Sequence, residues 1–221
     1  MEVLIEDQVK NTIPQFKLGV IHYSGIHVTE SPQMLKGRLR LFQEKIFFDL
    51  ENKKVADLDG IKEWREIFKA VGTDPNRYRP SNEALFRRIQ KQQYLHPVHS
   101  AVDLNNFFSL QYEIPFGIYD KEKIVGNITL KIGDEKDYYA AINGRDVNMK
   151  NKLLTADDLG AFGSPYVDSK RTAVQVSTQN AIHFIYLRPS MKNSEAEKML
   201  SSIAEMFTQI HGGEANYELI S

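Results

Sequence analysis

The apolar positions of the N-terminal part of the chain predict two helices. In residues 31–50, leucine, phenylalanine and isoleucine recur at helical spacing. Ser31 precedes this segment and can cap it, and Pro32 suits a first helical position. Residues 59–71 carry a second apolar face, and the pattern stops at Gly72, a residue that commonly ends helices.

Two further helices are expected later in the sequence. The first begins at Ser81, whose hydroxyl can accept from a free N–H of the first turn, and Glu83 lies near the positive end of its dipole. The second has the clearest boundaries. Ser194 and Glu197 are spaced as a capping box, and Gly212 follows the last apolar position of the helix.

Short strands are predicted by alternating or continuous apolar runs. One lies within residues 16–28, and the period changes to that of strands between about residues 100 and 189. There, residues 127–135 alternate, residues 136–144 end in an Asn-Gly turn, and residues 172–187 hold two apolar runs. We therefore expect one α+β domain over residues 1–221, with a helical N-terminal flank, a central sheet of short strands and a C-terminal helix.

The composition is that of an ordinary globular protein. Of 221 residues, 42% are hydrophobic and 26% are charged, and the formal net charge is −1. Such a chain is not coated in cations for non-specific nucleic-acid binding, although a local basic patch fits. There is no cysteine, which excludes disulfides and zinc–thiolate sites. Without an apolar run of ~20 residues or a secretion signal, we expect a cytoplasmic protein with no membrane partner.

Motifs of the common enzyme classes are absent from the sequence. The segment GAFGSPY is not a G-x-S-x-G hydrolase elbow, and there is no phosphate-binding loop, zinc-protease motif or dinucleotide fingerprint. His96 and His99 flank Pro97 and could offer two imidazoles to a metal. Because no acidic or cysteine partner lies nearby, two ordinary histidines are the better interpretation, and we expect neither a metal nor a cofactor.

Two segments have the residue types of a small-molecule pocket. Residues 101–120 mix apolar side chains with neutral hydrogen-bonding groups, which suits a ligand with a polar head. An amphipathic helix with solvent-facing asparagines explains this segment equally well. Residues 160–172 combine glycines, whose backbone can approach a ligand closely, with polar side chains. A plain surface loop is the alternative there. The candidate pocket residues in these segments are Asn105, Asn106, Ser109, Gly117, Gly160, Gly163, Ser164 and Asp168.

Cations are concentrated in residues 72–91. An Asp74–Pro75 turn leads into the third predicted helix, which has two adjacent arginines. The phosphates of a nucleic acid would be attracted to this edge. Alternatively, cations in the last turns of a helix complement its dipole, for ~0.3–1 kcal/mol each. The candidate RNA-binding residues are Arg79, Arg87, Arg88 and Lys91.

A segment within residues 95–120 resembles the editing domain of the bacterial phenylalanyl-tRNA synthetase beta subunit. That family has a Pro-x-x-Asn-x-Val-Val-Asp-Val-Thr-Asn-Tyr motif followed by Pro-Leu-His-Ala-Phe-Asp. The resemblance covers roughly residues 60–190 in several blocks and indicates a free-standing relative of the domain, without the other modules of a synthetase. The positions that match the motif are Pro97, Val102, Asp103, Asn106, Leu110, Pro115 and Asp120.

The resemblance implies a pocket that departs from the family pattern. Asn105 and Asn106 fall on the family's Thr-Asn pair, and the glycine-rich pocket loop corresponds approximately to residues 160–164. The pocket histidine falls on Gly117, and the glutamate that recognises a tyrosine hydroxyl falls near His183 or Phe184. Selection of tyrosine should therefore be lost, because an unpaired buried polar partner costs ~1–3 kcal/mol.

The expected function follows from the same resemblance. The family hydrolyses the ester of a mischarged aminoacyl-tRNA without a metal, so we expect a domain that binds aminoacyl-tRNA and deacylates it in trans. His99, His183 or Asp168 could position the water. A module that binds tRNA or an amino-acid-like ligand without chemistry is the alternative. In either case, residues 101–120 and 160–172 are expected to form opposite walls of one pocket.

Overall fold

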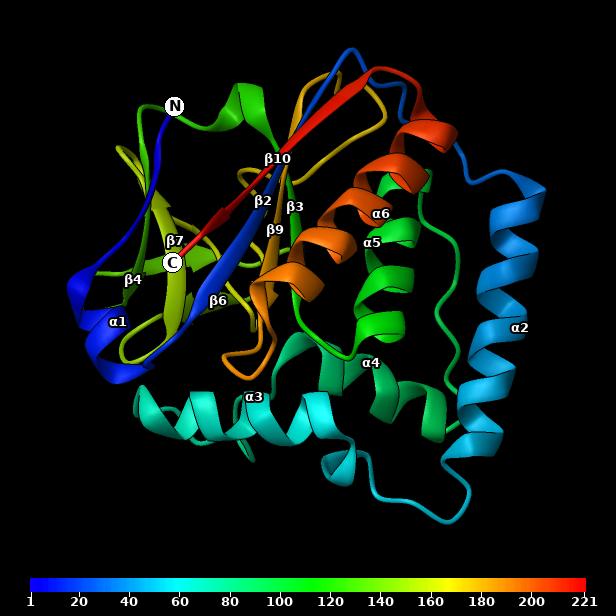
Figure 1. Ribbon diagram of the computed structural model, residues 1–221, viewed down its shortest axis with the longest axis horizontal. Coiled ribbons are helices and arrows are strands. Elements are labelled where there is room, and N and C mark those ends of the chain that lie inside the picture. Colours follow the sequence, from blue (N-terminus) through cyan, green and yellow to red (C-terminus); the bar gives the residue numbers. More distant parts are fainter.

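A four-stranded antiparallel sheet, sheet B, lies at the centre of the molecule. The computed structural model describes all 221 residues (Figure 1). The strand order of sheet B is β10–β2–β9–β3. Strand β9 is buried along its whole length, so both faces of the sheet are covered at this central strand. The strands span Lys17–Ser24 in β2, Phe116–Asp120 in β3, Ala181–Leu187 in β9 and Glu214–Ile220 in β10.

A second four-stranded sheet, sheet A, covers one face of sheet B. Its order is β1–β4–β7–β8, with β1 parallel to β4 and the other pairs antiparallel. A separate hairpin of β5 and β6 follows β4 in the chain. The strands span Val3–Ile5 in β1, Ile128–Ile132 in β4, Tyr138–Ala140 in β5, Asp146–Asn148 in β6, Leu153–Asp157 in β7 and Gly160–Gly163 in β8.

Helices cover the other face of sheet B and its lower end. In Figure 1, α5 and α6 lie against the sheet, α2 stands outside α5, and α3 and α4 cross beneath. The helices span Asp7–Thr12 in α1, Gln33–Asp49 in α2, Asp59–Ala70 in α3, Ser81–Gln90 in α4, Ser100–Tyr112 in α5 and Asn193–His211 in α6; two 3₁₀ turns span Val55–Asp57 (η1) and Lys121–Lys123 (η2). None of the helices has both the length and the apolar character needed to cross a bilayer.

Strand alternation divides the core into two layers. On β9, Phe184 points toward sheet A, where its ring lies 6.4 Å from that of Phe162. The preceding His183 points toward the helices, 6.1 Å from the ring of Phe207 on α6. Because successive side chains of a strand point to opposite faces, neighbouring residues of β9 belong to different layers.

The α+β class and the four predicted helices are confirmed. The Asn-Gly turn also forms, at Gly144 between β5 and β6, where φ is +80°. Residues 100–112, placed in the strand region by the sequence, form α5. Eight residues of α5 are buried. When a helix is apolar on most sides, the helical spacing of its apolar residues cannot be recognised in the sequence. The strands β1 and β10 and the helix α1 lack a strong sequence signal and were not predicted.

The predicted caps are wrong in their details. Ser31 does not cap α2, because its hydroxyl donates to the buried carboxylate of Asp103 at 2.5 Å. Ser194 lies inside α6 and makes no capping bond, since α6 begins one residue before it. Ser81 is the first residue of α4, and its buried hydroxyl has no partner. Of the three serines, only Ser31 has a tertiary contact in place of the predicted capping bond. Only the second of the two apolar runs in residues 172–187 forms a strand.

Candidate nucleic-acid interface

A hollow lined by cations opens beside helix α4. It has a volume of about 560 Å³ and lies between the α4 helix, the segment before it, the tip of the β5–β6 hairpin and the loop after β8. No acidic residue lines it, although the whole chain is nearly neutral. We call this site the cationic hollow. Its charged residues are Arg77, Arg79, Arg87, Arg88, Lys91 and Arg145.

Most of these cations are not neutralised inside the protein. Only Arg87 forms an ion pair, with its Nε 2.7 Å from Glu83 Oε1. The other five are exposed and have no carboxylate within ion-pairing distance. Like charges held together in this way repel one another, and an anion in the hollow would relieve the repulsion.

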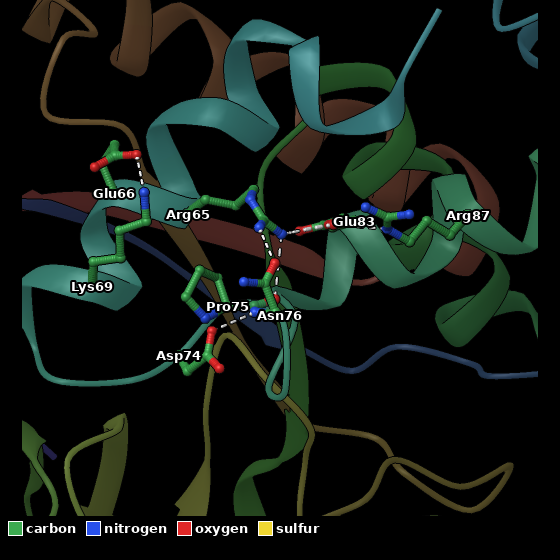
Figure 2. A network of polar contacts seen from close by, with 8 residues as sticks. All are labelled: Arg65, Glu66, Lys69, Asp74, Pro75, Asn76, Glu83 and Arg87. Atoms are coloured by element: carbon green, nitrogen blue, oxygen red, sulfur yellow. Dashed lines mark hydrogen bonds and ion pairs between the residues drawn. The ribbon is translucent and has the colours of Figure 1, made fainter.

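An ionic network fixes the position of α4 and hence of the hollow (Figure 2). Glu83 has no exposed side-chain surface, and both of its oxygens accept hydrogen bonds from Arg65 on α3 at 3.0 Å. Arg65 also donates to Asn76 Oδ1 and to the carbonyl of Pro75. Figure 2 shows Arg87 on the opposite side of Glu83 from Arg65. Arg65 on α3 therefore binds both the predicted Asp74–Pro75 turn and helix α4.

The loop after β8 forms the other wall of the hollow. Its Tyr166 ring packs edge-on against Tyr78, with centroids 5.6 Å apart, and the N–H of Ser81 donates to the carbonyl of Pro165. The ammonium of Lys152 lies 4.0 Å from the Tyr78 centroid. Burial and the nearby charge of Arg77 lower the pKa of Lys152. An aromatic floor among cations can bind both phosphates and bases.

The four predicted RNA-binding residues all line this one hollow. Two of its cations were missed. Arg77 was within the same stretch of sequence, and its charge could have been counted with the others. Arg145 is more than fifty residues from α4, and nothing local connects the two; only the hairpin fold brings them together.

A second polar cluster, between the two sheets, contains several of the predicted pocket residues. Its centre is the buried Tyr119 on β3, whose hydroxyl donates to Asp168 Oδ1 at 2.5 Å. A Cβ atom added at Gly117 or at Gly163 would overlap this hydroxyl, so both glycines allow the tyrosine to fold against their backbone. The Ser164 hydroxyl oxygen accepts from the N–H of Val167 and lies 3.1 Å from the Tyr139 hydroxyl, which shapes the adjoining loop.

Asp168 is a carboxylate with an unusual environment. Burial raises its pKa to about 7, although hydrogen bonds from Tyr119 and from the backbone of Ser164 oppose the shift. The residue as a whole is half-buried. The buried hydroxyls of Tyr186 and Thr155 lie in the same layer and have no hydrogen-bond partner of normal geometry. A carboxylate with this pKa can both release and accept a proton near neutral pH.

The remaining predicted pocket residues lie on the helical side of sheet B. His183 Nε2 is 3.1 Å from Asn105 Oδ1, and its Nδ1 is 3.3 Å from the Tyr23 hydroxyl. Burial lowers the pKa of His183 to about 3, so the ring is neutral and links α5 to β2. Ser109 donates to the carbonyl of Ile114 near the end of α5. Asn106, next to Asn105 on α5, is half-buried.

The structure therefore does not bring the predicted pocket residues together in a single pocket. Residues 116–120 do meet residues 160–168, around Tyr119. Asn105, Asn106 and His183 lie on the other face of sheet B, because β9 and β3 project successive side chains to opposite sides. Gly160 lies apart from both groups and lines a hollow of about 440 Å³ beside β5.

The two histidines of the H-x-x-H segment do not converge on a common site. His99 precedes α5, its Nδ1 accepts from the N–H of Val102, and its Nε2 is 3.3 Å from the carbonyl of Val174. His96 is exposed and lines a different hollow beside α2. No group of three or more histidine, aspartate or glutamate side chains is arranged to hold a metal ion.

Comparison with known proteins places this fold in a family. Residues 63–209 match the model of the B3/4 domain, which covers more than half of the chain. The chain belongs to the B3/4 domain family. A relative of similar length is the uncharacterized protein YhzB of Bacillus subtilis (strain 168), which is 32% identical over 213 residues, or 96% of each chain.

Other relatives of this B3/4 domain are much longer proteins. The phenylalanine–tRNA ligase beta subunit of Fusobacterium nucleatum is 29% identical over 98 residues, which are 43% of this chain and 12% of the ligase subunit. An N-terminal fragment of the phenylalanyl-tRNA synthetase beta subunit from Pyrococcus horikoshii is a structural neighbour. Its TM-score is 0.49 at 14% identity, covering 97% of this chain and 50% of the fragment.

The predicted resemblance to the synthetase beta subunit is confirmed by the B3/4 match and by the ligase relative. This B3/4 domain is thus a synthetase-related domain. It spans only a small part of the ligase subunit, so the activity of the whole ligase does not follow from the match.

Proposed function

We propose that this B3/4 domain binds tRNA, with phosphates of the RNA in the cationic hollow. One observation carries the proposal: six cations from three separate segments line one hollow, and only Arg87 has an acidic partner. Binding of phosphates releases condensed counterions, so free cations in a group favour RNA strongly at low salt. The name of the ligase relative, which refers to tRNA, supports this choice of nucleic acid.

The test is a triple variant in which Arg79, Arg88 and Lys91 are replaced by glutamine. Arg87 is left in place because its ion pair with Glu83 stabilises the fold. We expect weaker binding of tRNA, and a slope of log affinity against log salt that is smaller by about two to three units. Folding should change little, since none of the three has an ion-pair partner.

A matched control removes the same charge elsewhere. Lys62, Lys192 and Lys198 are exposed, form no ion pair and do not line the hollow. Their replacement by glutamine should leave the salt slope within about one unit of the original value. If both triple variants lower the affinity and the slope equally, general charge rather than the hollow governs binding, and the proposal is wrong.

Hydrolysis of an aminoacyl-tRNA ester in trans is the second candidate function. It is favoured by Asp168, a carboxylate with a pKa of about 7 whose position is fixed by Tyr119. Such a group can accept a proton from a water molecule that attacks the ester carbonyl.

The substrate of this reaction is expected to be a tRNA that carries a small amino acid. Gly117 stands where the resemblance puts the family histidine, and the Tyr119 hydroxyl occupies the space beside it. The aromatic ring of a tyrosyl ester would compete with Tyr119 for that space. We therefore expect serine, threonine or alanine to be released in preference to tyrosine.

Discharge of a panel of misacylated tRNAs separates hydrolysis from binding alone. Each rate is compared with spontaneous hydrolysis and with the rate of the Asp168→Asn variant. Hydrolysis predicts a rate that falls by about 100-fold or more in the variant, with unchanged tRNA affinity. A rate equal to the spontaneous one for every tRNA would leave a binding module without chemistry, which is the alternative function.

A further inference from the structure

The hollow of about 440 Å³ beside β5, which contains Gly160, has a lining unlike that of the cationic hollow. Two large side chains from separate elements stand open to solvent there: Tyr138 on β5 is 71% exposed, and Leu159 in the β7–β8 turn is 65% exposed. The Tyr138 ring has no aromatic partner, and its hydroxyl makes no hydrogen bond. An exposed, unpaired ring beside an apolar side chain is a surface on which a planar ligand group can stack. We call it the Tyr138 hollow.

The charges of the Tyr138 hollow are largely used within the protein. Arg171 makes a two-point ion pair with Asp157 and also donates to the carbonyls of Lys123 and Gly160. Asp137 pairs with Lys131 at 2.9 Å. Only Lys136 is free of such a partner. The hollow therefore has little net charge to offer a phosphate, and its open surface suits an uncharged ring.

The two hollows are neighbours on either side of a thin wall. Tyr139 lines the Tyr138 hollow, and its hydroxyl donates to the carbonyl of Val167, which lines the cationic hollow. Ser169 lines the Tyr138 hollow only two residues further along the chain from Val167. Two residues span at most ~7 Å. The two hollows therefore share the wall formed by residues 167–169.

The β5–β6 hairpin contributes to both sites. Its tip places Asn143 and Arg145 in the cationic hollow, and its first strand places Tyr138 in the other. The hairpin is held against the loop after β8 by the bridge between Ala141 and Ser169 and by the N–H of Ile142, which donates to the carbonyl of Asp168. The two hollows are consequently fixed relative to each other.

We propose that the Tyr138 hollow holds an unpaired base of the nucleic acid whose phosphates lie in the cationic hollow, and that the ligand is single-stranded at this site. This inference rests on the proposed function. In a duplex, both faces of a base are stacked on its neighbours and its edge is paired with the other strand. Such a base cannot stack on an isolated tyrosine ring. The protein therefore binds an unpaired segment, such as a free strand end, more tightly than a duplex of equal length.

The experiment compares two probes and three proteins, with a fourth protein as the control. The probes are a 12-nucleotide single-stranded RNA of mixed sequence and a 12-base-pair RNA duplex, and binding is measured by fluorescence anisotropy at several salt concentrations. The proteins are the unaltered chain, Tyr138→Ala and Tyr138→Phe. Tyr217→Ala, on the exposed strand β10 and outside both hollows, is the matched control.

We expect Tyr138→Ala to bind the single strand about tenfold more weakly, which is the loss of one base–aromatic stack. Its salt slope should be unchanged, because no phosphate contact is removed. Tyr138→Phe keeps the ring and should bind normally, as should Tyr217→Ala. Duplex binding should be weaker than single-strand binding in the unaltered chain and insensitive to Tyr138.

Other outcomes separate this inference from the proposed function. One such outcome is that the salt slope for the single strand depends on Arg79, Arg88 and Lys91, while Tyr138→Ala binds as tightly as the unaltered chain. The proposed base site would then be wrong, and the proposed phosphate site in the cationic hollow would be supported. If Tyr138→Ala and Tyr138→Phe are equally weak, a stacked base is also excluded. Absence of binding to either probe and to tRNA overturns both proposals.

Discussion

Glu83 and Asp168 are two carboxylates within the fold that have opposite kinds of partners. Glu83 lies between the guanidinium groups of Arg65 and Arg87 and has no exposed side-chain surface. Asp168 has no cation beside it and is held by the neutral hydroxyl of Tyr119. A carboxylate bonded to two arginines fixes the helices that carry them. One that is held only by a hydroxyl can change its protonation state near neutral pH, because burial raises its pKa to about 7.

This contrast corresponds to the two proposed roles of the molecule. The Glu83 network positions α4, from which Arg87, Arg88 and Lys91 reach the cationic hollow. The Asp168 cluster lies behind the loop that forms the other wall of that hollow. A rigid binding surface and a titratable group are therefore joined through residues 164–168, which belong to both environments.

The largest expected effect is that of Glu83→Gln. The substitution leaves Arg65 and Arg87 without their shared carboxylate, and breaking a buried ion pair in this way costs about 3–5 kcal/mol. Urea denaturation measures the loss as a lower midpoint. Glu66→Gln removes an exposed pair with Lys69 on the same α3 helix and should change stability by less than about 0.5 kcal/mol. Equal losses of stability in the two variants would show that the buried ion pairs of Glu83 stabilise the fold no more than an exposed pair does.

A smaller loss is expected from Gly117→Ala, which tests how tightly Tyr119 is held beside Asp168. The added methyl group overlaps the Tyr119 hydroxyl, and overpacking of this kind costs about 1–3 kcal/mol. Adding Tyr119→Phe should recover part of the loss, because the overlapping oxygen is removed. Gly37→Ala is the control: its Cβ meets nothing in α2, and it should stabilise the helix by up to about 1 kcal/mol. A tolerated Gly117→Ala would mean that Tyr119 is mobile.

The pH dependence of stability should be the most subtle effect, since two buried groups act in opposite directions. Folding raises the pKa of Asp168 from 3.8 to about 7, so its contribution is present below about pH 4 and is lost as the pH rises toward 7. Folding lowers the pKa of His183 from 6.5 to about 3, so its contribution is present above pH 6.5 and is lost as the pH falls toward 3.

Single variants separate these two contributions. Relative to the unaltered chain, Asp168→Asn should lose more stability on acidification from pH 7 to 4, and His183→Gln should lose less. Other groups with a lowered pKa, such as His22 and His211, act equally in all three proteins and cancel in the comparison. Urea midpoints at half-unit pH steps provide the measurement. If the curves of urea midpoint against pH are parallel for the three proteins, burial shifts the pKa of neither Asp168 nor His183.

Local pattern was enough to identify the elements that have one apolar face. The α3 and α6 helices follow directly from apolar positions three and four residues apart. The α5 helix was ambiguous because nearly all of its positions are buried, and burial on every side removes the period. The capping residues failed for a related reason: Ser31 has a better partner in Asp103, seventy-two residues away, than in its own helix.

The sequence by itself determined the α+β class, the family and the charged stretch around α4, because each depends on residues that are neighbours in the chain. Only the tertiary structure decided which of these residues share a site. Strand alternation directed His183 toward Asn105 on one face of sheet B and Tyr119 toward Asp168 on the other. Hairpin closure brought Arg145 to the arginines of α4. Both arrangements depend on pairing between strands that are far apart in the sequence. The pattern of residues along the chain does not show which distant segments are close in space.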